Sequence, residues 1–209
     1  MKIYTFPFGP LGANMYVADV GGNYVLIDPS VSPEKIIDSG KFGDDFLSKI
    51  SAILITHAHF DHVLYVDYWA KKISCPIYIS SDDAAFLKDS DKNCSSHMMD
   101  DTAFFTVFYV EPKLLDDSLV INDNMIRIIK TPGHTPGSVC FLFEQEKVMF
   151  SGDMLFAGAI GRCDLPLGNE SAMLNSIELL KTMDDDILVY PGHGYYTKLG
   201  IEKARNPYF

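Results

Sequence analysis

Three histidines and one aspartate within six residues constrain this chain of 209 residues more than any other feature. His57, His59, Asp61 and His62 follow the apolar run 52–56, which predicts a strand buried on both faces, and they precede a helical pattern. Four such side chains at the end of a buried strand destabilise the fold unless they bind a common partner. A divalent metal ion binds this combination of side chains. We therefore expect a metal centre here rather than a solvated loop with a chance cluster.

The spacing within this motif allows two groups of metal ligands. His57 and His59 point to the same side of an extended segment, because side chains alternate along it with a period of two. Asp61 and His62 begin the helix, so they can face a second point nearby. The motif therefore predicts donors for two ions rather than one.

Three later segments each place one further donor at the end of a predicted strand. His134 lies in a Thr-Pro-Gly-His-Thr-Pro-Gly turn, Asp153 follows the apolar run 147–151, and His193 lies in a Pro-Gly-His-Gly turn. Strand ends that meet at one rim of a sheet would bring these loops to the motif. The expected groups are His57, His59 and His134 for one ion, Asp61, His62 and His193 for the other, and Asp153 as the bridge.

The rest of the chain predicts strands and helices in two similar halves. Strands are expected over 3–6, 15–19, 24–28, 52–56 and 76–80, and then over 118–121, 125–131, 138–143, 147–151 and 187–190. Helices are expected after Ser32, over 61–72, from 81, over 170–183 with Leu174, Ile177 and Leu180 on its apolar stripe, and over 199–204. Because no low-complexity linker divides the halves, we expect one domain over 1–209, with two sheets sharing a core and helices outside.

Residues 89–112 fit neither pattern cleanly. A polar start leads to Met98 and Met99, and then to Phe104, Phe105, Phe108 and Tyr109. Aromatic runs usually belong to a core, so we favour a segment that packs on the core over one that walls a cleft. His97, in the polar part, is expected at the surface.

Charge and hydropathy limit the partners and the location. Seventeen Lys and Arg against 28 Asp and Glu give a formal net charge of −11, which disfavours nucleic acid and anionic membranes as partners. No apolar run approaches the roughly eighteen residues of a membrane span, and the N-terminus lacks the pattern of a signal peptide, so a cytoplasmic location is expected. The four cysteines are far apart and form no CxxC pair, which fits a reducing compartment.

At the candidate ligands the chain resembles the metallo-β-lactamase-fold hydrolases. His57-Ala58-His59-Phe60-Asp61-His62 matches the HxHxDH motif of that superfamily, and His134, Asp153 and His193 match its three later ligand positions in order. Asp28 matches the early acidic residue that supports the metal site from outside the ligand set. The resemblance implies an α+β fold, a four-layer αββα sandwich of two mixed sheets with helices on the outer faces.

Within that superfamily the chain is most similar to the glyoxalase II group, the hydroxyacylglutathione hydrolases. The similarity lies in the segments 131–138, 151–156 and 161–166 and in the terminal Asn-Pro-Tyr-Phe of residues 206–209. Typical members continue into a helical region that binds the glutathione carboxylates, whereas this sequence ends at Phe209, so no such extension is expected. Arg162 occupies the place of a basic residue that faces the thiol, and Tyr65 would narrow the cleft or simply pack.

The resemblance implies hydrolysis of an acyl thioester, such as a 2-hydroxyacyl thiol, by a metal-bound hydroxide. Asp61 would bind metal and orient the hydroxide, and Asp153 would bridge the ions, which makes both the expected catalytic residues. Zinc is the expected metal, with iron or manganese as alternatives, because histidine and carboxylate ligands suit all three. The expected partner is a small-molecule thioester, and the sequence indicates no particular oligomeric state.

Other activities share this ligand set. A persulfide dioxygenase would hold one iron on His57, His134 and Asp153, and a lactonase would use the full set. The negative net charge disfavours the nucleases of the fold. A metal-binding module without activity would lack a ligand, and no ligand is missing from this sequence.

Overall fold

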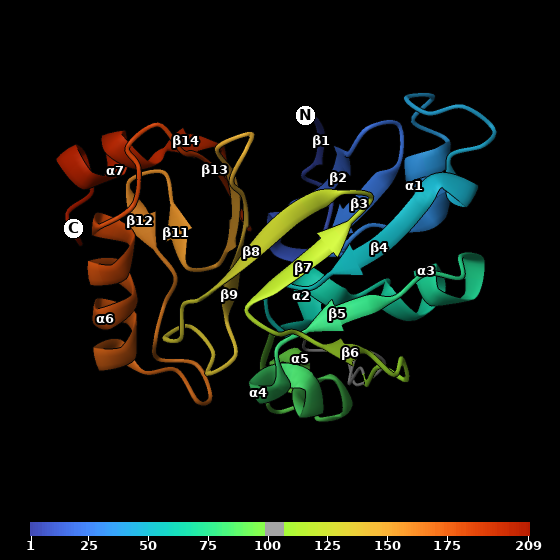
Figure 1. Ribbon diagram of the computed structural model, residues 1–209. Helices are drawn as coiled ribbons and strands as arrows, with labels where there is room; N and C mark the ends of the chain where they lie inside the picture. The colour runs from blue at the N-terminus through green and yellow to red at the C-terminus, as the bar shows by residue number, and fades with distance from the viewer. Residues whose placement is uncertain (99–106) are drawn as a thin grey trace.

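Two six-stranded sheets stacked face to face form the centre of the structure, a computed structural model that describes residues 1–98 and 107–209 (Figure 1). The first sheet has the order β1 (Lys2–Phe6), β2 (Met15–Asp19), β3 (Tyr24–Ile27), β4 (Ile50–Leu54), β5 (Ile77–Ile79) and β6 (Lys113–Leu114). The second has the order β14 (Thr197–Lys198), β13 (Leu188–Pro191), β10 (Val148–Gly152), β9 (Val139–Phe143), β8 (Asn124–Lys130) and β7 (Ser118–Ile121). A separate hairpin pairs β11 (Leu155–Phe156) with β12 (Ala159–Ile160).

Both sheets are mixed. In the first, β1 to β3 are antiparallel and β3 to β6 are parallel. In the second, β7 to β10 are antiparallel, β13 joins β10 in parallel, and β14 is antiparallel to β13.

Helices cover the outer faces of the two sheets. The helices in the described residues are α1 (Pro33–Ile37), α2 (Phe60–Val63), α3 (Val66–Lys72), α4 (Ser81–Ala84), α5 (Ser95–Met98), α6 (Glu170–Lys181) and α7 (Leu199–Arg205), with the 3-10 turns η1 (Pro10–Gly12), η2 (Leu47–Lys49) and η3 (Ala85–Lys88). From left to right, Figure 1 shows α6 and α7, the second sheet, the first sheet, and α1 with α3. The expected four-layer αββα sandwich of the α+β class is confirmed.

The alternation of side chains along the strands divides the apolar residues among three layers of core. On β2, Val17 packs toward α1 and α3, whereas Ala18 packs against the second sheet. On β9, Phe141 packs against the first sheet, whereas Leu142 packs toward α6. The period of two thus explains why the central strands are apolar on both faces.

Two details of the helices differ from expectation. The stripe of α6 is Met173, Ile177 and Leu180, while Leu174 is 49% exposed, so the expected place of Leu174 on the stripe is wrong by one position. The single helix expected over 61–72 is also wrong. It divides at Tyr65, whose backbone N–H leaves the helical ladder and donates to the carbonyl of Pro29 at 3.0 Å.

None of the helices in the described residues is long and apolar enough to cross a membrane.

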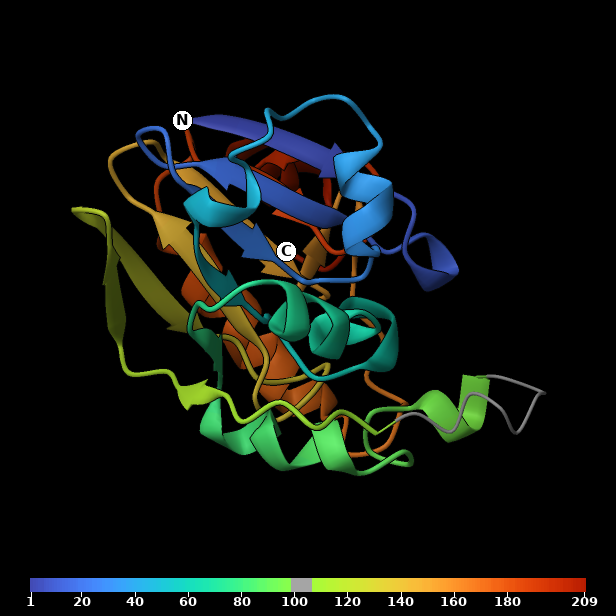
Figure 2. The ribbon, with the colours of Figure 1, turned by 90° about the vertical axis from the view of Figure 1, so that its right-hand side faces the viewer.

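The segment 89–112 packs on the core where it is described. Phe108 is buried and donates its backbone N–H to Leu87, whereas Tyr109 is exposed. Figure 2, seen from the side of α1 and α3, shows α4 and η3 along the lower edge of the molecule. His97 is at the surface, as expected. Met99, Phe104 and Phe105 lie outside the described residues.

The ends of neighbouring strands converge on one rim of the sandwich. Asp28 follows β3, the motif follows β4, Asp153 follows β10, and His193 follows β13. Because β3 is parallel to β4 and β10 is parallel to β13, each pair of loops emerges at the same edge of its sheet. The candidate site therefore draws side chains from both sheets.

Candidate metal centre

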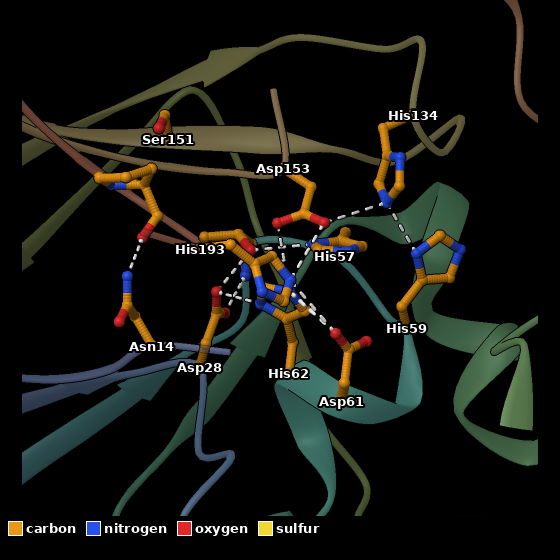
Figure 3. Close-up of polar contacts among 12 residues, drawn as sticks. Asn14, Asp28, His57, His59, Asp61, His62, His134, Ser151, Asp153 and His193 are labelled. Carbon is orange, nitrogen blue, oxygen red and sulfur yellow. Dashed lines mark hydrogen bonds and ion pairs between the residues drawn. The ribbon is translucent and has the colours of Figure 1, made fainter. Parts of the chain in front are cut away.

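The structure brings all seven candidate ligands together (Figure 3). The ligand atoms of His57, His59 and His134 lie within 4.8 Å of one another, and so do those of Asp61, His62 and His193. A third group at the same spacing joins His57 and His62 to Asp153. The two groups expected from the sequence are thus adjacent, with Asp153 between them.

In the first group, His59 and His134 face each other directly. Their Nδ1 and Nε2 atoms are 2.8 Å apart. The other ring nitrogen of His134, Nδ1, lies 2.7 Å from the backbone carbonyl oxygen of Arg162. Because a carbonyl can only accept, Nδ1 of His134 carries the proton and Nε2 keeps a lone pair directed into the site.

In the second group, the imidazoles of His62 and His193 lie beside two carboxylates, with their Nε2 atoms 3.4 Å apart. His193 Nε2 lies 3.3 Å from Asp61 Oδ2 and 3.5 Å from Asp153 Oδ2. His62 Nε2 lies 3.2 Å from Asp153 Oδ1. Asp153 Oδ2 also lies 3.5 Å from His134 Nε2 of the first group, so this carboxylate touches both groups.

Asp28 sets the proton positions of two ligands. Its Oδ2 accepts from the Thr56 hydroxyl at 2.7 Å and from His62 Nδ1 at 2.9 Å, and its Oδ1 accepts from the Thr56 N–H. The Thr56 hydroxyl uses its single proton to donate to Asp28, so it accepts from Nδ1 of His57 at 3.1 Å. Each ring therefore carries a proton on Nδ1, so Nε2 is the atom that faces the centre and could bind a metal ion.

The role of Asp28 is accompanied by backbone strain. Its φ of 51° lies in the left-handed region, which Asp tolerates better than most residues. Strained residues of this kind cluster at functional sites, where the surrounding structure maintains them.

The charges in the cluster leave room for a cation. Burial lowers the pKa of His57 well below its usual value and that of His59 to about 3, so both rings are neutral. Burial also acts to lower the pKa values of His62 and His193, but the carboxylates of Asp153 and Asp61 outweigh it, and the pKa of His193 rises to about 9. Without a metal ion, the protonated imidazoles of His62 and His193 thus balance the charge of the carboxylates. A divalent ion would supply this positive charge in their place.

Two buried atoms support the fit of a metal ion. Within the described residues, His57 Nε2 and Asp153 Oδ1 form no hydrogen bond, although the oxygen lies 3.2 Å from His62 Nε2. Buried polar atoms rarely lack a partner, and an imidazole nitrogen and a carboxylate oxygen are ordinary ligands of divalent ions. The residues present therefore fit divalent metal ions.

A glycine allows the bridging carboxylate to approach. A Cβ atom on Gly192 would lie 2.1 Å from Asp153 Oδ1 and 2.6 Å from Cε1 of His62. Any side chain at this position would displace both groups. The Pro-Gly-His-Gly turn thus contributes space as well as His193.

Sequence reasoning missed the residues that hold the ligand loops. Asn14 donates its side-chain amide to the carbonyls of Pro191 and Gly194, both at 3.0 Å, and Tyr16 donates its hydroxyl to Pro191. These bonds fix the turn that carries His193. An isolated Asn before a strand gave no signal of this role.

Asp83 joins two further ligand loops and was also missed. Its Oδ2 accepts from the Ala58 N–H at 3.0 Å and from the Thr135 hydroxyl at 2.8 Å, and its Oδ1 accepts from the Gly137 N–H at 2.7 Å. Ala58 lies between His57 and His59, and Thr135 follows His134. Asp83 therefore sets the distance between these loops.

Asp83→Ala is expected to lower the free energy of unfolding by about 3 kcal/mol, because it leaves three buried donors without their acceptor. Urea denaturation measures the loss. Asp82→Ala removes an exposed neighbouring carboxylate and should change the stability by less than about 0.5 kcal/mol. Equal losses in the two variants would contradict the role assigned to Asp83.

A cleft of about 450 Å³ opens onto the metal centre. Its lining combines five of the candidate ligands with mainly apolar residues, namely Leu11, Phe60, Cys94, Phe156, Ala159, Ile160, Gly161, Arg162 and Leu165. Tyr65 is not among these residues. It packs against the core and Tyr68, so the suggested substrate contact gives way to the packing alternative.

Arg162 lines the cleft, but its charge is already paired. Its Nε and Nη2 donate to the two carboxylate oxygens of Asp164 at 2.6 and 2.7 Å. The contact lowers the pKa of Asp164 to about 2. The cleft thus presents a neutral ion pair where the sequence suggested a free cation.

The chain is similar to known proteins of one superfamily. Residues 8–193 match the family model described as the metallo-beta-lactamase superfamily. The chain is 35% identical over 211 residues to the probable metallo-hydrolase YqgX of Bacillus subtilis (strain 168), covering 100% of this chain and 97% of the relative. It is 31% identical over 194 residues to the hydroxyacylglutathione hydrolase GloC of Haemophilus influenzae, covering 89% of this chain and 87% of the relative.

Two solved structures extend the similarity to three dimensions. The crystal structure of BLEG-1 B3 metallo-beta-lactamase has a TM-score of 0.90 and 34% identity, covering 99% of both chains. The structure of TTHA1623 in a di-iron-bound form has a TM-score of 0.82 and 31% identity, covering 99% of this chain and 100% of that one. The similarity therefore spans nearly the whole chain.

Proposed function

This chain belongs to the metallo-beta-lactamase superfamily and is a metallo-hydrolase, and from that premise we propose that it cleaves acyl thioesters. The relative named hydroxyacylglutathione hydrolase GloC supports a thioester of a 2-hydroxy acid. We further propose zinc as the metal, while the di-iron form of TTHA1623 makes iron the alternative.

The lining of the cleft favours a leaving group that needs no proton. Apart from the candidate ligands, its titratable side chains in the described structure are Cys94 and Arg162. Burial raises the pKa of Cys94 to about 11, and the Arg162 guanidinium is held by Asp164. A thiolate leaves readily without an acid, whereas an amine requires protonation. This difference favours a thioester over an amide.

The donor set explains how hydrolysis would proceed. Divalent ions bound by the seven ligands would supply an activated water and a Lewis acid for the scissile carbonyl. Asp61 borders the cleft, so its carboxylate can orient the attacking water. Asp28 holds the protons of His62 and, through Thr56, of His57 away from the centre. The apolar wall limits access of bulk water to the acyl group.

A substrate panel joined to elemental analysis tests this proposal. The panel contains a 2-hydroxyacyl glutathione thioester, an uncharged acyl thioester, a lactone, a β-lactam, and glutathione persulfide with oxygen monitoring. We expect metal-loaded protein to hydrolyse a thioester fastest. Oxygen consumption with persulfide, without hydrolysis of either thioester, would replace the proposal with a dioxygenase.

The paired charge of Arg162 leads to a prediction about the thiol carrier. Asp164→Asn removes the neutralising carboxylate and should lower the KM for the glutathione thioester by about threefold, as expected for one exposed ionic contact. The KM for the uncharged thioester should not change. Asp164→Glu keeps the charge and serves as the control. Equal changes of the KM for both substrates would show that Arg162 does not interact with the charge of the thiol.

A further inference from the structure

Two buried polar residues of the C-terminal segment contact the β11–β12 hairpin. Glu202 of α7 is 3% exposed and Asn206, just after α7, is 4% exposed. The Glu202 carboxylate accepts from the Gly158 N–H at 2.8 Å, the Thr197 hydroxyl at 2.6 Å and the Asn206 side chain at 2.9 Å. The Asn206 amide also donates to the carbonyl of Ala159 at 3.1 Å.

These contacts hold the turn of the β11–β12 hairpin. Gly158 lies between the strands, and Ala159 begins β12. A hairpin of two residues per strand is marginal by itself. In Figure 1, α7 lies at the same end of the molecule as this hairpin. The buried carboxylate and amide therefore supply the support that the short ladder lacks.

The hairpin forms one wall of the cleft. Phe156, Ala159 and Ile160 line it. The hairpin begins after Asp153 and leads into Arg162, whose carbonyl orients His134. None of the candidate ligands lies within residues 155–160, so a shift of the hairpin would first move the surface that meets the acyl group.

We propose that Glu202 and Asn206 are positioning residues that set substrate affinity by fixing this wall. The inference rests on the proposed hydrolysis of a thioester in the same cleft. It also gives a role to Asn206, the first residue of the terminal Asn-Pro-Tyr-Phe segment. Neither side chain is among the residues that line the cleft, so they act through Gly158 and Ala159.

Asn206→Ala and Thr197→Val form a matched pair. Asn206→Ala removes the bond to Ala159 and one bond to Glu202, whereas Thr197→Val removes a bond to the same carboxylate from β14. Both variants should lower the midpoint of urea denaturation. Asn206→Ala should raise the KM for the thioester about tenfold, the effect of one to two hydrogen bonds, with kcat within about twofold and unchanged metal content. Thr197→Val leaves both bonds to the hairpin in place and should therefore change the KM less than Asn206→Ala does.

Hydrogen exchange of the metal-free protein gives a readout independent of activity. The amides of residues 155–160 should exchange faster in Asn206→Ala than in Thr197→Val. If Asn206→Ala does not fold, Glu202→Gln replaces it, since the amide disrupts one of the acceptor positions while keeping the volume. The inference would be overturned if Asn206→Ala, or Glu202→Gln in its place, had the same KM as Thr197→Val. Equal rates of amide exchange over residues 155–160 in the two variants would also overturn it. Absence of thioesterase activity in the wild type would refute the proposed function, and hydrogen exchange would still decide whether α7 holds the hairpin.

Discussion

Asp153→Ala is expected to abolish metal binding and hydrolysis together, with kcat falling by about a thousandfold or more. The Asp153 carboxylate lies 3.2 Å from His62 and 3.5 Å from both His134 and His193, so it joins the two groups of ligands. Its removal takes the carboxylate away from His134 and leaves Asp61 as the carboxylate beside His62 and His193. Elemental analysis after dialysis and steady-state kinetics measure the two effects.

The control for this variant is Asp186→Ala. Asp186 is an exposed aspartate paired with Lys147 and Lys198, away from the candidate ligands. It should keep its metal content and its kcat. Two tightly bound ions per chain in Asp153→Ala would show that Asp153 is not the bridge.

Asp28→Asn is expected to weaken metal binding by about 10–100-fold although Asp28 is not a ligand. Its two oxygens accept from three donors, which are the Thr56 N–H, the Thr56 hydroxyl and His62 Nδ1. An amide has one acceptor oxygen, so either orientation of the substituted side chain sets a donor against a donor. Where the amide nitrogen takes the place of Oδ2, His62 would be driven to carry its proton on Nε2, where the metal would bind. Competition with a fluorescent chelator measures the affinity.

Thr56→Val separates the two branches of this network. It removes the hydroxyl that links Asp28 to His57 and leaves the Asp28–His62 bond in place, so its effect should be smaller than that of Asp28→Asn. Asp38→Asn changes an exposed aspartate and should have no effect. If Asp28→Asn bound metal as tightly as the wild type, the proton positions assigned here would be wrong.

The sequence was most informative about the site where metal-ligating residue types follow the ends of predicted strands. Seven donors could be assigned because each lies beside an apolar run, and parallel strands bring their ends to one rim. Asn14, Asp83 and Glu202 could not be found in this way, because each acts on backbone groups of distant segments. Their residue types are common in turns and helix ends, so only the tertiary structure distinguishes them.

The break at Tyr65 shows a second limit of sequence patterns. The apolar periodicity of 61–72 fits one helix, but it contains no information about the Pro29 carbonyl that captures the Tyr65 N–H. The charge of Arg162 shows a third limit. A basic residue at a familiar position predicts an anion contact, whereas Asp164 two residues later already occupies its guanidinium.

Because the donors come from both sheets, a bound ion is also a cross-link of the fold. His59 and His134 are 75 residues apart in sequence, and His62 and His193 are 131 apart. An ion that holds such pairs closes long loops and restricts the unfolded chain much as a disulfide does. Binding to the folded state alone also makes its stability depend on the free metal concentration. The four cysteines form no disulfide in the described structure, and a bound metal ion would link the two halves instead.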